Sequence, residues 1–397
     1  MISFDQVRLL QKETIHPGDR WIYVTDANIK VKDGKLKNTD RLDVELDDIA
    51  HIADQGGIVL ILAHKGRFKD GDADSLKPHA DYFSLKLKRP VPYFEYNTGE
   101  VAITFAKGLA PGSIAVMGNT RGHIGEEKND LALAKEFSML GSYIAVGGFG
   151  KAHRKDASNY GLLDYLPGSL ADSQVKEMVL LGPWAGKENK YSVVVLGGVK
   201  KEKITTGLLG FAKTYDSIIP GGIVLNTVLK AKGYDVGDSL LDDEGKTFEK
   251  ETLEILNSQE GSKICIPDEV IIAKKEGFID AKRINIQDGV PKGYMIVDYV
   301  LPSSGKESLD RVVLEHGRMI VAGTPGIYQS GFRIATDEVM NAMNNSAVQA
   351  IVLGGDTAAE VAFNGKVSTG GGSALYFVAN GTTPVFEKLK ENKKKFP

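Results

Sequence analysis

The chain has 397 residues, of which 42% are hydrophobic and 25% are charged, a composition typical of a water-soluble globular protein. The formal net charge of −3 lacks the basic excess of a nucleic-acid-binding protein, and no apolar run approaches the roughly 20 residues of a membrane-spanning helix. Cys265 is the only cysteine and the first residues lack the regions of a signal peptide, so we expect a cytoplasmic protein without an intrachain disulfide.

The first half of the chain alternates apolar runs with amphipathic segments, which predicts an α/β domain built on a parallel sheet. The run 57–62 has the unbroken hydrophobic character of a central strand. Further strands are predicted at 21–24, 90–94, 113–117 and 142–146, and helices are predicted at 41–52 and 75–87.

Cationic or polar side chains follow four of these strands, at the point where each strand ends. Because the carboxyl ends of parallel strands meet at one edge of a sheet, we expect these side chains to converge there. Any one of them could be an ordinary surface residue, but their recurrence at equivalent positions favours a pocket for a small acid with both a carboxylate and a phosphate. The residues are Arg41, His64, Arg67, Arg121, His153 and Arg154.

A helix predicted over 167–181, and the break that follows it at 182–186, indicate a linker between two domains of ordinary size. The alternation of strands and helices then restarts, and glycine-rich turns follow most of the strands. The second half is therefore also predicted to be α/β with mostly parallel strands. Its strands are predicted at 191–196, 217–219, 263–266, 269–273, 318–322 and 350–353.

The glycine-rich stretch Lys366–Leu375 is the most informative part of the second half. A strand-like Val-Ser-Thr runs into Gly370–Gly372 and then into a helix-compatible segment, so backbone N–H groups and a helix dipole can meet an anion there. The turn Leu353–Ala359 repeats the pattern and adds Asp356, an oxygen ligand suited to Mg²⁺. A flexible loop is the alternative for the first stretch, and a helix N-cap is the alternative for Asp356.

Several separate motifs follow one another along the chain. They are Asp26-Ala-Asn28, Arg41, Ala63-His-Lys-Gly-Arg67, Asn119-Thr-Arg121, Gly150–Arg154, Gly197-Gly-Val-Lys200, Gly221-Gly222 with Asn226, Gly354-Gly-Asp-Thr357 and Ser368-Thr-Gly-Gly-Gly372. In order and spacing they resemble the motifs of phosphoglycerate kinases over nearly the whole chain, and the middle loop is similar to archaeal-type members. The resemblance implies two Rossmann-like domains with mostly parallel sheets: 1–168 with the tail 380–397 for the acid, 169–186 as a hinge helix, and 187–379 for the nucleotide.

The resemblance also implies the reaction and the residues that perform it. The expected activity is reversible, Mg²⁺-dependent phosphoryl transfer between ATP/ADP and the carboxylate of 3-phosphoglycerate in glycolysis and gluconeogenesis, by a monomer that binds neither nucleic acid nor membrane. The implied acid-binding residues are Asp26, Asn28, Arg41, His64, Arg67, Arg121 and Arg154. The implied nucleotide-binding residues are Gly198, Lys200, Lys203, Gly221, Gly222, Asn226, Gly323, Gln329, Gly354, Gly355, Asp356, Thr357, Ser368, Thr369 and Gly370. Arg41, Lys200, Gly371 and Gly372 are the implied catalytic residues, and Asp356 is the implied metal ligand.

Departures from the family pattern cluster at polar positions. They are Val24 for an arginine, Val146-Gly147 for an Asn-Asp pair, Ala322 for an asparagine, Gln329 for a glutamate and Tyr376 for an acid, with Lys203 one residue early. Two alternatives therefore stand beside phosphoglycerate kinase activity: a related kinase that forms an acyl phosphate from another small phosphorylated or phosphonylated carboxylate, and a non-catalytic nucleotide- or anion-binding relative. The presence of Arg41, Lys200 and Asp356 favours a catalyst.

Overall fold

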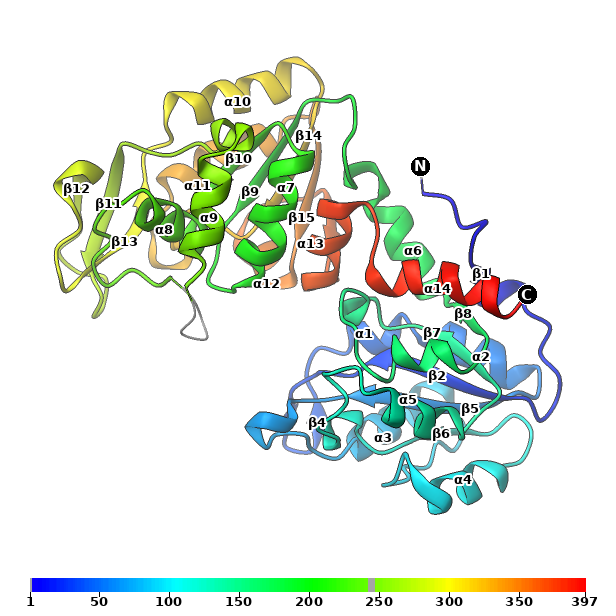
Figure 1. Cartoon of the computed structure of the whole chain (residues 1–397). Coiled ribbons are helices and arrows are strands. Elements are labelled where there is room, and N and C mark those ends of the chain that lie inside the picture. The colour runs from blue at the N-terminus through cyan, green and yellow to red at the C-terminus, as the bar shows by residue number, and fades with distance from the viewer. Residues whose placement is uncertain (1, 242–246) are drawn as a thin grey trace. The chain divides into compact units, whose positions relative to one another are not determined.

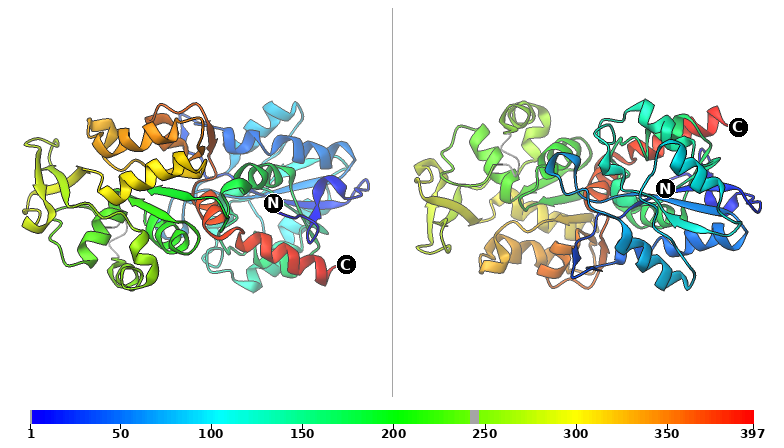
Figure 2. Two further views of the ribbon diagram at one scale, coloured as in Figure 1. Left: turned by 90° about the horizontal axis from the view of Figure 1, so that it is seen from above. Right: turned by 90° about the horizontal axis from the view of Figure 1, so that it is seen from below.

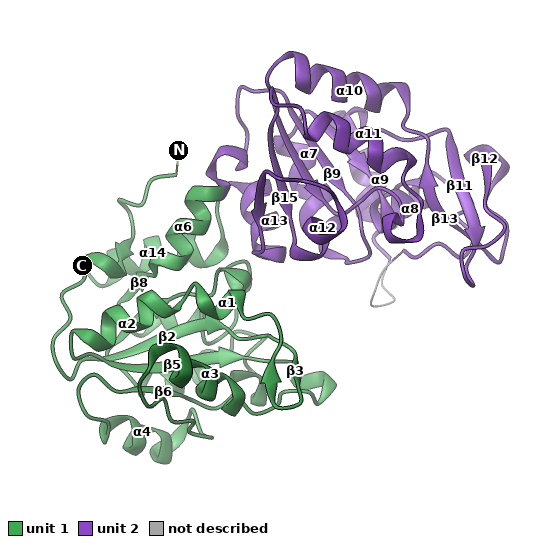
Figure 3. Cartoon of the chain, turned by 180° about the vertical axis from the view of Figure 1, so that it is seen from behind, with its two compact units in different colours: residues 1–180, 382–397 green, residues 181–381 purple. Residues whose placement is uncertain are grey.

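The computed structural model describes residues 2–241 and 247–397, which divide into two compact units (Figure 1). Unit 1 extends to Leu180 and includes the C-terminal segment Thr382–Pro397, and unit 2 spans Leu181–Gly381 (Figure 3). The division falls at the end of helix α6 (Asp172–Leu181).

The described part of unit 1 is built on a six-stranded sheet in which all neighbouring strands are parallel. All seven residues of β5 and six of the seven residues of β2 are buried, because helices cover both faces of the sheet (Figure 2). In spatial order the strands are β1 (Arg8–Leu9), β8 (Gly168–Leu170), β7 (Tyr143–Val146), β2 (Arg20–Asp26), β5 (Ile58–His64) and β6 (Ile114–Val116).

The connections of unit 1 are helical apart from one hairpin. The hairpin pairs β3 (Val31–Lys32) with β4 (Lys35–Leu36) in antiparallel register. The helices before α6 are α1 (Asp40–Asp43), α2 (Leu46–Asp54), α3 (Lys77–Leu87), α4 (Gly99–Lys107) and α5 (Leu131–Ser138).

The basic C-terminal helix α14 (Pro384–Lys395) packs on unit 1. Its apolar face is buried through Phe386 and Leu389. Lys393 Nζ donates to the backbone carbonyl of Asp5 at 2.8 Å, so the helix lies beside the N-terminal segment, as the two views of Figure 2 show. Lys393 therefore helps to hold the C-terminal helix against the N-terminal segment of unit 1.

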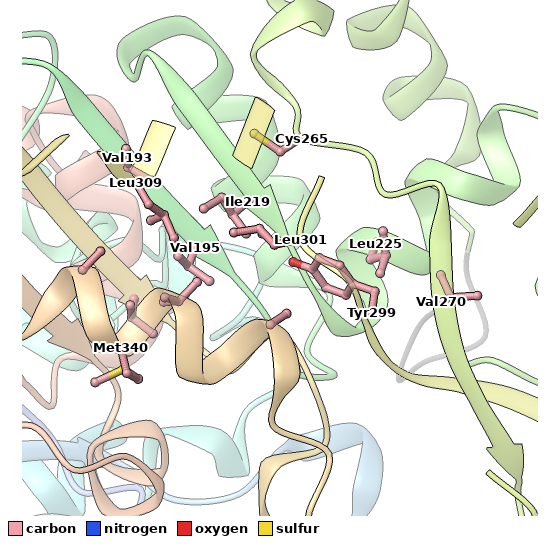
Figure 4. Packing of buried hydrophobic residues seen from close by; sticks show 14 of the residues in the cluster. Val193, Val195, Ile219, Leu225, Cys265, Val270, Tyr299, Leu301, Leu309 and Met340 are labelled. Atoms are coloured by element: carbon pink, nitrogen blue, oxygen red, sulfur yellow. The ribbon is translucent and has the colours of Figure 1, made fainter. Parts of the chain in front are cut away.

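The described part of unit 2 contains a five-stranded parallel sheet and a three-stranded antiparallel sheet. One apolar core joins the two sheets: Val195 and Ile219 from the larger sheet and Tyr299 from the smaller one belong to the same buried cluster (Figure 4). Tyr299 Oη also donates to the carbonyl of Pro220 at 2.6 Å. The parallel order is β10 (Ser217–Pro220), β9 (Ser192–Leu196), β14 (Arg318–Ala322), β15 (Gln349–Leu353) and β16 (Lys366–Ser368), and the antiparallel order is β12 (Lys282–Asn285), β11 (Glu269–Lys274) and β13 (Tyr294–Tyr299).

Most helices in the described part of unit 2 follow strands of its parallel sheet, whereas α9 follows α8, and α10 follows β13 of the antiparallel sheet. A π-helix, η7 (Lys203–Leu208), runs directly into α7 (Leu209–Thr214). The other α-helices are α8 (Gly222–Ala231), α9 (Glu249–Leu256), α10 (Ser303–Leu314), α11 (Ile334–Met343), α12 (Gly355–Glu360) and α13 (Gly371–Asn380). Short 3₁₀ turns in the two units lie at Leu10–Lys12, Phe68–Asp70, Thr120–Gly122, Phe149–Lys151, Gly161–Asp164, Gly182–Trp184, Gln259–Lys263, Ile286–Asp288 and Tyr328–Ser330.

Two predicted strands are wrong. Residues 90–94, all of them described, form no strand, and Tyr93 pairs with Val116 only as an isolated bridge. Pro90 and Pro92 have no N–H group to donate to a sheet. The described residues 263–266 likewise form no strand, because Gln259–Lys263 is a 3₁₀ turn and the following residue makes a single bridge.

Two predicted helix boundaries also need correction. The helix predicted over 41–52 is divided into α1 and α2 at Val44–Glu45. The segment predicted to begin a helix at 167 first forms the strand β8, and α6 begins only at Asp172. The predicted fold class, α/β with mostly parallel sheets, is confirmed.

Candidate active site

Three predicted acid-binding residues of unit 1 lie together at the carboxyl edge of its sheet. Asp26 ends β2 and His64 ends β5, and the parallel register places the two residues directly opposite each other. Arg41 Nη1 donates to Asp26 Oδ2 at 2.9 Å, while His64 Nε2 lies 3.7 Å from Asp26 Oδ1. Asp26 is buried, whereas the Arg41 side chain is 41% exposed, so this guanidinium is both anchored and accessible.

The charges around Asp26 determine the protonation of this cluster. Burial opposes ionisation of Asp26, but His64, Arg41 and the Asn28 backbone N–H together lower the pKa of Asp26 below its usual value. Burial lowers the pKa of His64 well below its usual value, against the opposing effect of Asp26. The nearby Arg121 and Arg154 add to this lowering. The buried Nδ1 of His64 has no hydrogen-bond partner among the described residues.

The remaining predicted acid-binding residues lie on the loops next to this cluster. Asn28 is exposed, and its Oδ1 accepts a hydrogen bond from the N–H of Gly66 at 3.2 Å. Arg67 follows on the same loop. Burial is the largest cause that lowers the pKa of Arg121, and the charges of Arg154 and then of the nearby Arg67 lower it further. Arg121 itself is fully buried, and its Nη2 donates to Asp156 at 3.1 Å. Arg154 is half-buried.

Lys151 is a further cation of this edge that the sequence analysis did not select. It is buried, its Nζ donates to Ser158 Oγ at 3.1 Å, and its charge acts on both Asp26 and His64. Burial lowers the pKa of Lys151. Its place inside the motif Gly150–Arg154 was the signal available in the sequence.

In unit 2 a glycine-containing loop follows every strand of the parallel sheet. These loops contain the predicted residues Gly198 after β9, Gly221 and Gly222 after β10, Gly323 after β14, Gly354 and Gly355 after β15, and Gly370 after β16. The carboxyl edge of a parallel sheet is where such loops bind ligands. Backbone N–H groups therefore dominate the chemistry of this edge.

Two of these glycines are required by close backbone packing. Gly222 has φ +50°, and a Cβ on it would lie 2.2 Å from the carbonyl oxygen of Gly198. Gly323 has φ +98°, and its Cβ would lie 2.3 Å from the carbonyl oxygen of Gly197. No side chain fits at these points, so the loops after β9, β10 and β14 form one continuous backbone surface.

The loop after β16 presents the start of α13 to open space. Gly370 is the N-cap of α13, and Ser368 Oγ accepts from the Gly370 N–H at 3.2 Å. Thr369 is exposed, and a Cβ on Gly371 would meet no atom within 4 Å. With Gly372 in the same first turn, the N–H groups of this ten-residue helix can receive an anion.

Three lysines follow β9, and two of them are predicted site residues. Lys200 is exposed, and Lys203 is the half-buried first residue of the π-helix η7. Burial, and then the charge of Lys200, lower the pKa of Lys203 to about 8. The two ammonium groups are therefore neighbours, and irregular helical turns of this type are frequent at functional sites.

Asp356 lies in the first turn of α12, whose N-cap is Gly354. The alternative interpretation of Asp356 as an N-cap is therefore wrong. Its side chain is exposed, Gly355 leaves open space beside it, and Thr357 is buried beneath the turn. Within the described residues no three His, Cys, Asp or Glu side chains group as a metal site. A Mg²⁺ ion at Asp356 would take its other ligands from nucleotide phosphates and water, which suits the preferences of Mg²⁺.

The remaining nucleotide-side residues are engaged with protein groups. Asn226 is buried in α8, and its Nδ2 donates to the carbonyl of Leu240 at 2.8 Å. Gln329 is exposed, and its Nε2 donates to Glu360 Oε1 at 2.8 Å. Glu360 therefore places a carboxylate beside Gln329, an arrangement that spacing in the sequence could not show.

Each unit has its own chemistry. Unit 1 has a cationic edge around Asp26, Arg41 and His64, and unit 2 has a glycine-lined edge with two lysines and Asp356. Guanidinium groups bind the oxygens of small acids, and backbone N–H groups with a carboxylate and lysines suit nucleotide phosphates and their metal. These features define the class of the protein as a phosphotransferase that acts on a carboxylate.

The comparisons with known proteins identify the family. The sequence profile described as "Phosphoglycerate kinase" matches residues 15–380. A phosphoglycerate kinase of Thermosipho africanus is 34% identical over 394 residues, with 95% of this chain and 96% of the relative covered, and one of Legionella pneumophila is 31% identical over 389 residues, with 95% and 96% covered. The structure of phosphoglycerate kinase from Coxiella burnetii superimposes with a TM-score of 0.73 at 26% identity, with 97% of this chain and 99% of that chain covered. The chain belongs to the phosphoglycerate kinase family.

None of the helices in the described part of the chain is both long enough and apolar enough to cross a membrane.

Proposed function

We propose that this chain catalyses reversible phosphoryl transfer between ATP or ADP and the carboxylate of 3-phosphoglycerate, the glycolytic reaction of its family, as a cytoplasmic, Mg²⁺-dependent monomer. The observation that supports this most strongly is the ion pair of Arg41 with the buried Asp26. It anchors an accessible guanidinium at a sheet edge that also holds His64 and Arg154. A carboxylate and a phosphate on one small acid can both be bound there.

The chain contributes positioning and charge stabilisation rather than a covalent intermediate. Phosphoryl transfer depends mainly on holding the two reacting oxygens in line and neutralising the charge on the transferred group. In this proposal Arg41 and Lys200 neutralise that charge, and the N–H groups of Gly371 and Gly372 hold the phosphate oxygens. Asp356 would hold a Mg²⁺ ion, which would supply further charge neutralisation at the nucleotide phosphates.

The proposal also requires movement. The acid-binding residues belong to unit 1 and the nucleotide-binding residues to unit 2, so the bound ligands must be brought together. We assign this movement to the segment 169–186, between the bodies 1–168 with 380–397 and 187–379. Small-angle X-ray scattering is expected to show compaction only when the acid and the nucleotide are both present, and an unchanged radius of gyration at saturation would contradict the hinge.

A second candidate is an acyl-phosphate-forming kinase for another small phosphorylated or phosphonylated carboxylate. Val24 is buried and offers no polar group, and the loop Gly147–Gly148 has no side chain. The space that a side chain at Gly147 would occupy is filled by the Glu45 carboxylate. The acid-binding edge of unit 1 therefore lacks polar side chains at Val24 and Gly147, where the family pattern has them.

An ADP-release assay with MgATP separates these functions. We expect turnover with 3-phosphoglycerate at least about tenfold faster, as kcat/KM, than with phosphonylated or shorter phosphorylated carboxylates, which corresponds to 1.4 kcal/mol of discrimination. Faster turnover with another acid would support the second candidate. No ADP release with any acid, in a chain that still binds nucleotide by calorimetry, would indicate a non-catalytic relative.

A further inference from the structure

A buried acidic cluster lies beneath the acid-binding edge, and the roles assigned so far do not use it. Glu45, Asp48 and Tyr23 are each at most 1% exposed. Tyr23 Oη donates a short hydrogen bond to Glu45 Oε2 and lies 3.5 Å from Asp48 Oδ2. Buried carboxylates are retained only where they are hydrogen-bonded, so the partners of this cluster indicate what it stabilises.

One set of partners belongs to the loop that supports Asp26. The N–H of Gly148 donates to Glu45 Oε1 at 2.9 Å. Gly148 and Gly150 pack directly against Asp26. A Cβ on Gly148 would lie 2.4 Å from the Asp26 nitrogen, and a Cβ on Gly150 would lie 2.3 Å from Asp26 Oδ2. Since Asp26 anchors Arg41, the position of this loop determines where the guanidinium is held.

The other set of partners is the first turn of α6. The backbone N–H groups of Asp172 and Ser173 donate to Asp48 Oδ1 and Oδ2 at 3.0 and 2.9 Å. Ser173 Oγ donates to Glu45 Oε2 at 3.3 Å. Asp48 thus satisfies two N–H groups at the start of α6 that have no partner within the helix, and Glu45 accepts the hydroxyl hydrogen of Ser173 in the same turn.

The glycine at 147 is what makes room for this arrangement. A Cβ on Gly147 would lie 2.1 Å from Glu45 Oε2 and 2.5 Å from Tyr23 Oη. The absence of a side chain at Gly147 and the presence of the buried Glu45 carboxyl are therefore one structural feature.

We propose that Glu45 is a positioning residue for phosphoryl transfer: it holds the Gly147–Gly150 loop against the Asp26–Arg41 pair and connects that loop to the first turn of α6. The inference rests on the proposed function, in which Arg41 acts on the transferred group. The helix that begins at this connection is the one that leads from unit 1 into unit 2.

The cluster also makes this positioning sensitive to pH. Burial, together with the neighbouring Asp48 charge, raises the pKa of the Glu45 carboxyl to about 8, against the hydrogen bonds that lower it. The titratable and charged groups that face the cluster are Tyr23 from β2, Asp48 from α2 and, on α6, Asp172 with Lys176 paired to it at 2.9 Å. As pH rises toward and through 8, Glu45 becomes a second buried anion beside Asp48, and repulsion between the two carboxylates is expected to loosen the connection.

The test compares Glu45→Gln and Glu45→Ala, with Asp47→Asn, an exposed acid two residues further along the chain, as the matched control. Hydrogen–deuterium exchange is measured on peptides that cover 143–152 and 172–181, because it reports on the two connected segments without turnover. We expect Glu45→Ala to speed exchange about tenfold or more in both segments, and Glu45→Gln, which keeps an acceptor oxygen, to do so less.

Kinetics then separate positioning from a purely structural role. We expect kcat of Glu45→Ala to fall at least about tenfold with little change in KM for the nucleotide. We also expect kcat of the unmodified chain to fall as pH rises above 8, and we expect this fall to be absent in Glu45→Gln. Asp47→Asn should match the unmodified chain in both measurements.

The outcomes are distinct. Faster exchange in only one segment, or in neither, would overturn the connection. Faster exchange in both segments with unchanged kcat and an unchanged pH profile would overturn the positioning role. An unmodified chain without turnover on any acid would overturn the proposed function and, with it, the positioning role, while exchange would still show whether Glu45 connects the two segments.

Discussion

Substitution of Gly147 by alanine tests the packing beneath the acid-binding edge. The added Cβ would lie 2.1 Å from Glu45 Oε2 and 2.5 Å from Tyr23 Oη, whereas ordinary carbon–oxygen contacts are about 3.4 Å. The carboxyl group must therefore move by more than about 1 Å. Overpacking of a core typically costs about 1–3 kcal/mol. Loss of the Gly148 hydrogen bond adds roughly 1 kcal/mol, so we expect Gly147→Ala to lower the free energy of unfolding of unit 1 by about 2–4 kcal/mol.

Urea unfolding measures this effect within one unit. Trp21 lies in unit 1 and Trp184 in unit 2, so a Trp184→Phe background makes the fluorescence specific for unit 1. Gly122→Ala, in the same unit, is the matched control, because a Cβ there would meet no atom within 4 Å. A loss in Gly147→Ala below about 0.5 kcal/mol, similar to the control, would refute the packing argument.

A double-mutant cycle identifies the partner in this clash. Truncation of Glu45 to alanine removes the nearest atom, so Gly147→Ala should cost less in the Glu45→Ala background. We expect a coupling energy of about 1–3 kcal/mol. Additive effects would show that Glu45 and Gly147 are not in contact.

Three further predictions concern the candidate site and its surroundings. Arg41→Ala is expected to lower kcat by about 10²–10³ while the KM of the acid changes less, because it removes a donor aimed at the transferred group; steady-state kinetics with a loss below about tenfold would contradict this role. Asp356→Asn should raise the Mg²⁺ concentration for half-maximal rate by at least about tenfold, and an unchanged Mg²⁺ titration would exclude Asp356 as a ligand. Burial lowers the pKa of His79 to about 4, so the folded chain binds fewer protons than the unfolded chain between pH 4 and 6.5, and stability is lost as pH falls through that window. His79→Gln should reduce the change in the free energy of unfolding between pH 4 and 6.5, measured with urea, by up to about 3 kcal/mol. An unchanged pH dependence of this free energy would contradict the role given to His79. The matched controls are Arg89→Ala, Asp337→Asn and His16→Gln, all at solvent-accessible positions.

The strands of the parallel sheets were largely predictable from the sequence. The run predicted at 57–62 overlaps β5 from Ile58 onward, and the run at 318–322 coincides with β14, because a strand covered on both faces needs continuous apolar residues. The three-residue strand β8 was hidden, because its sequence also suits the start of a helix. The strand β12 was missed because it is mostly exposed and has no apolar run, and β13 was missed although it contains Met-Ile-Val and is mostly buried.

The candidate site was predictable only where a residue stands directly after a strand. Asp26 and His64 end neighbouring strands, so their proximity follows from the parallel register. Lys151 and Glu45 could not be found in this way, since their contacts depend on tertiary packing: Glu45 meets the N–H of Gly148 across 103 positions of the chain.

Chemical trapping of the product tests the central claim most directly. The chain is incubated with MgATP, 3-phosphoglycerate and hydroxylamine, which converts an acyl phosphate into a stable hydroxamate. The account predicts hydroxamate in amounts equal to the ADP released, only when nucleotide, metal and acid are all present, and reduced about 10²–10³-fold in rate in Arg41→Ala. Release of ADP without hydroxamate, or equal yields with and without the acid, would contradict transfer of the phosphoryl group to a carboxylate.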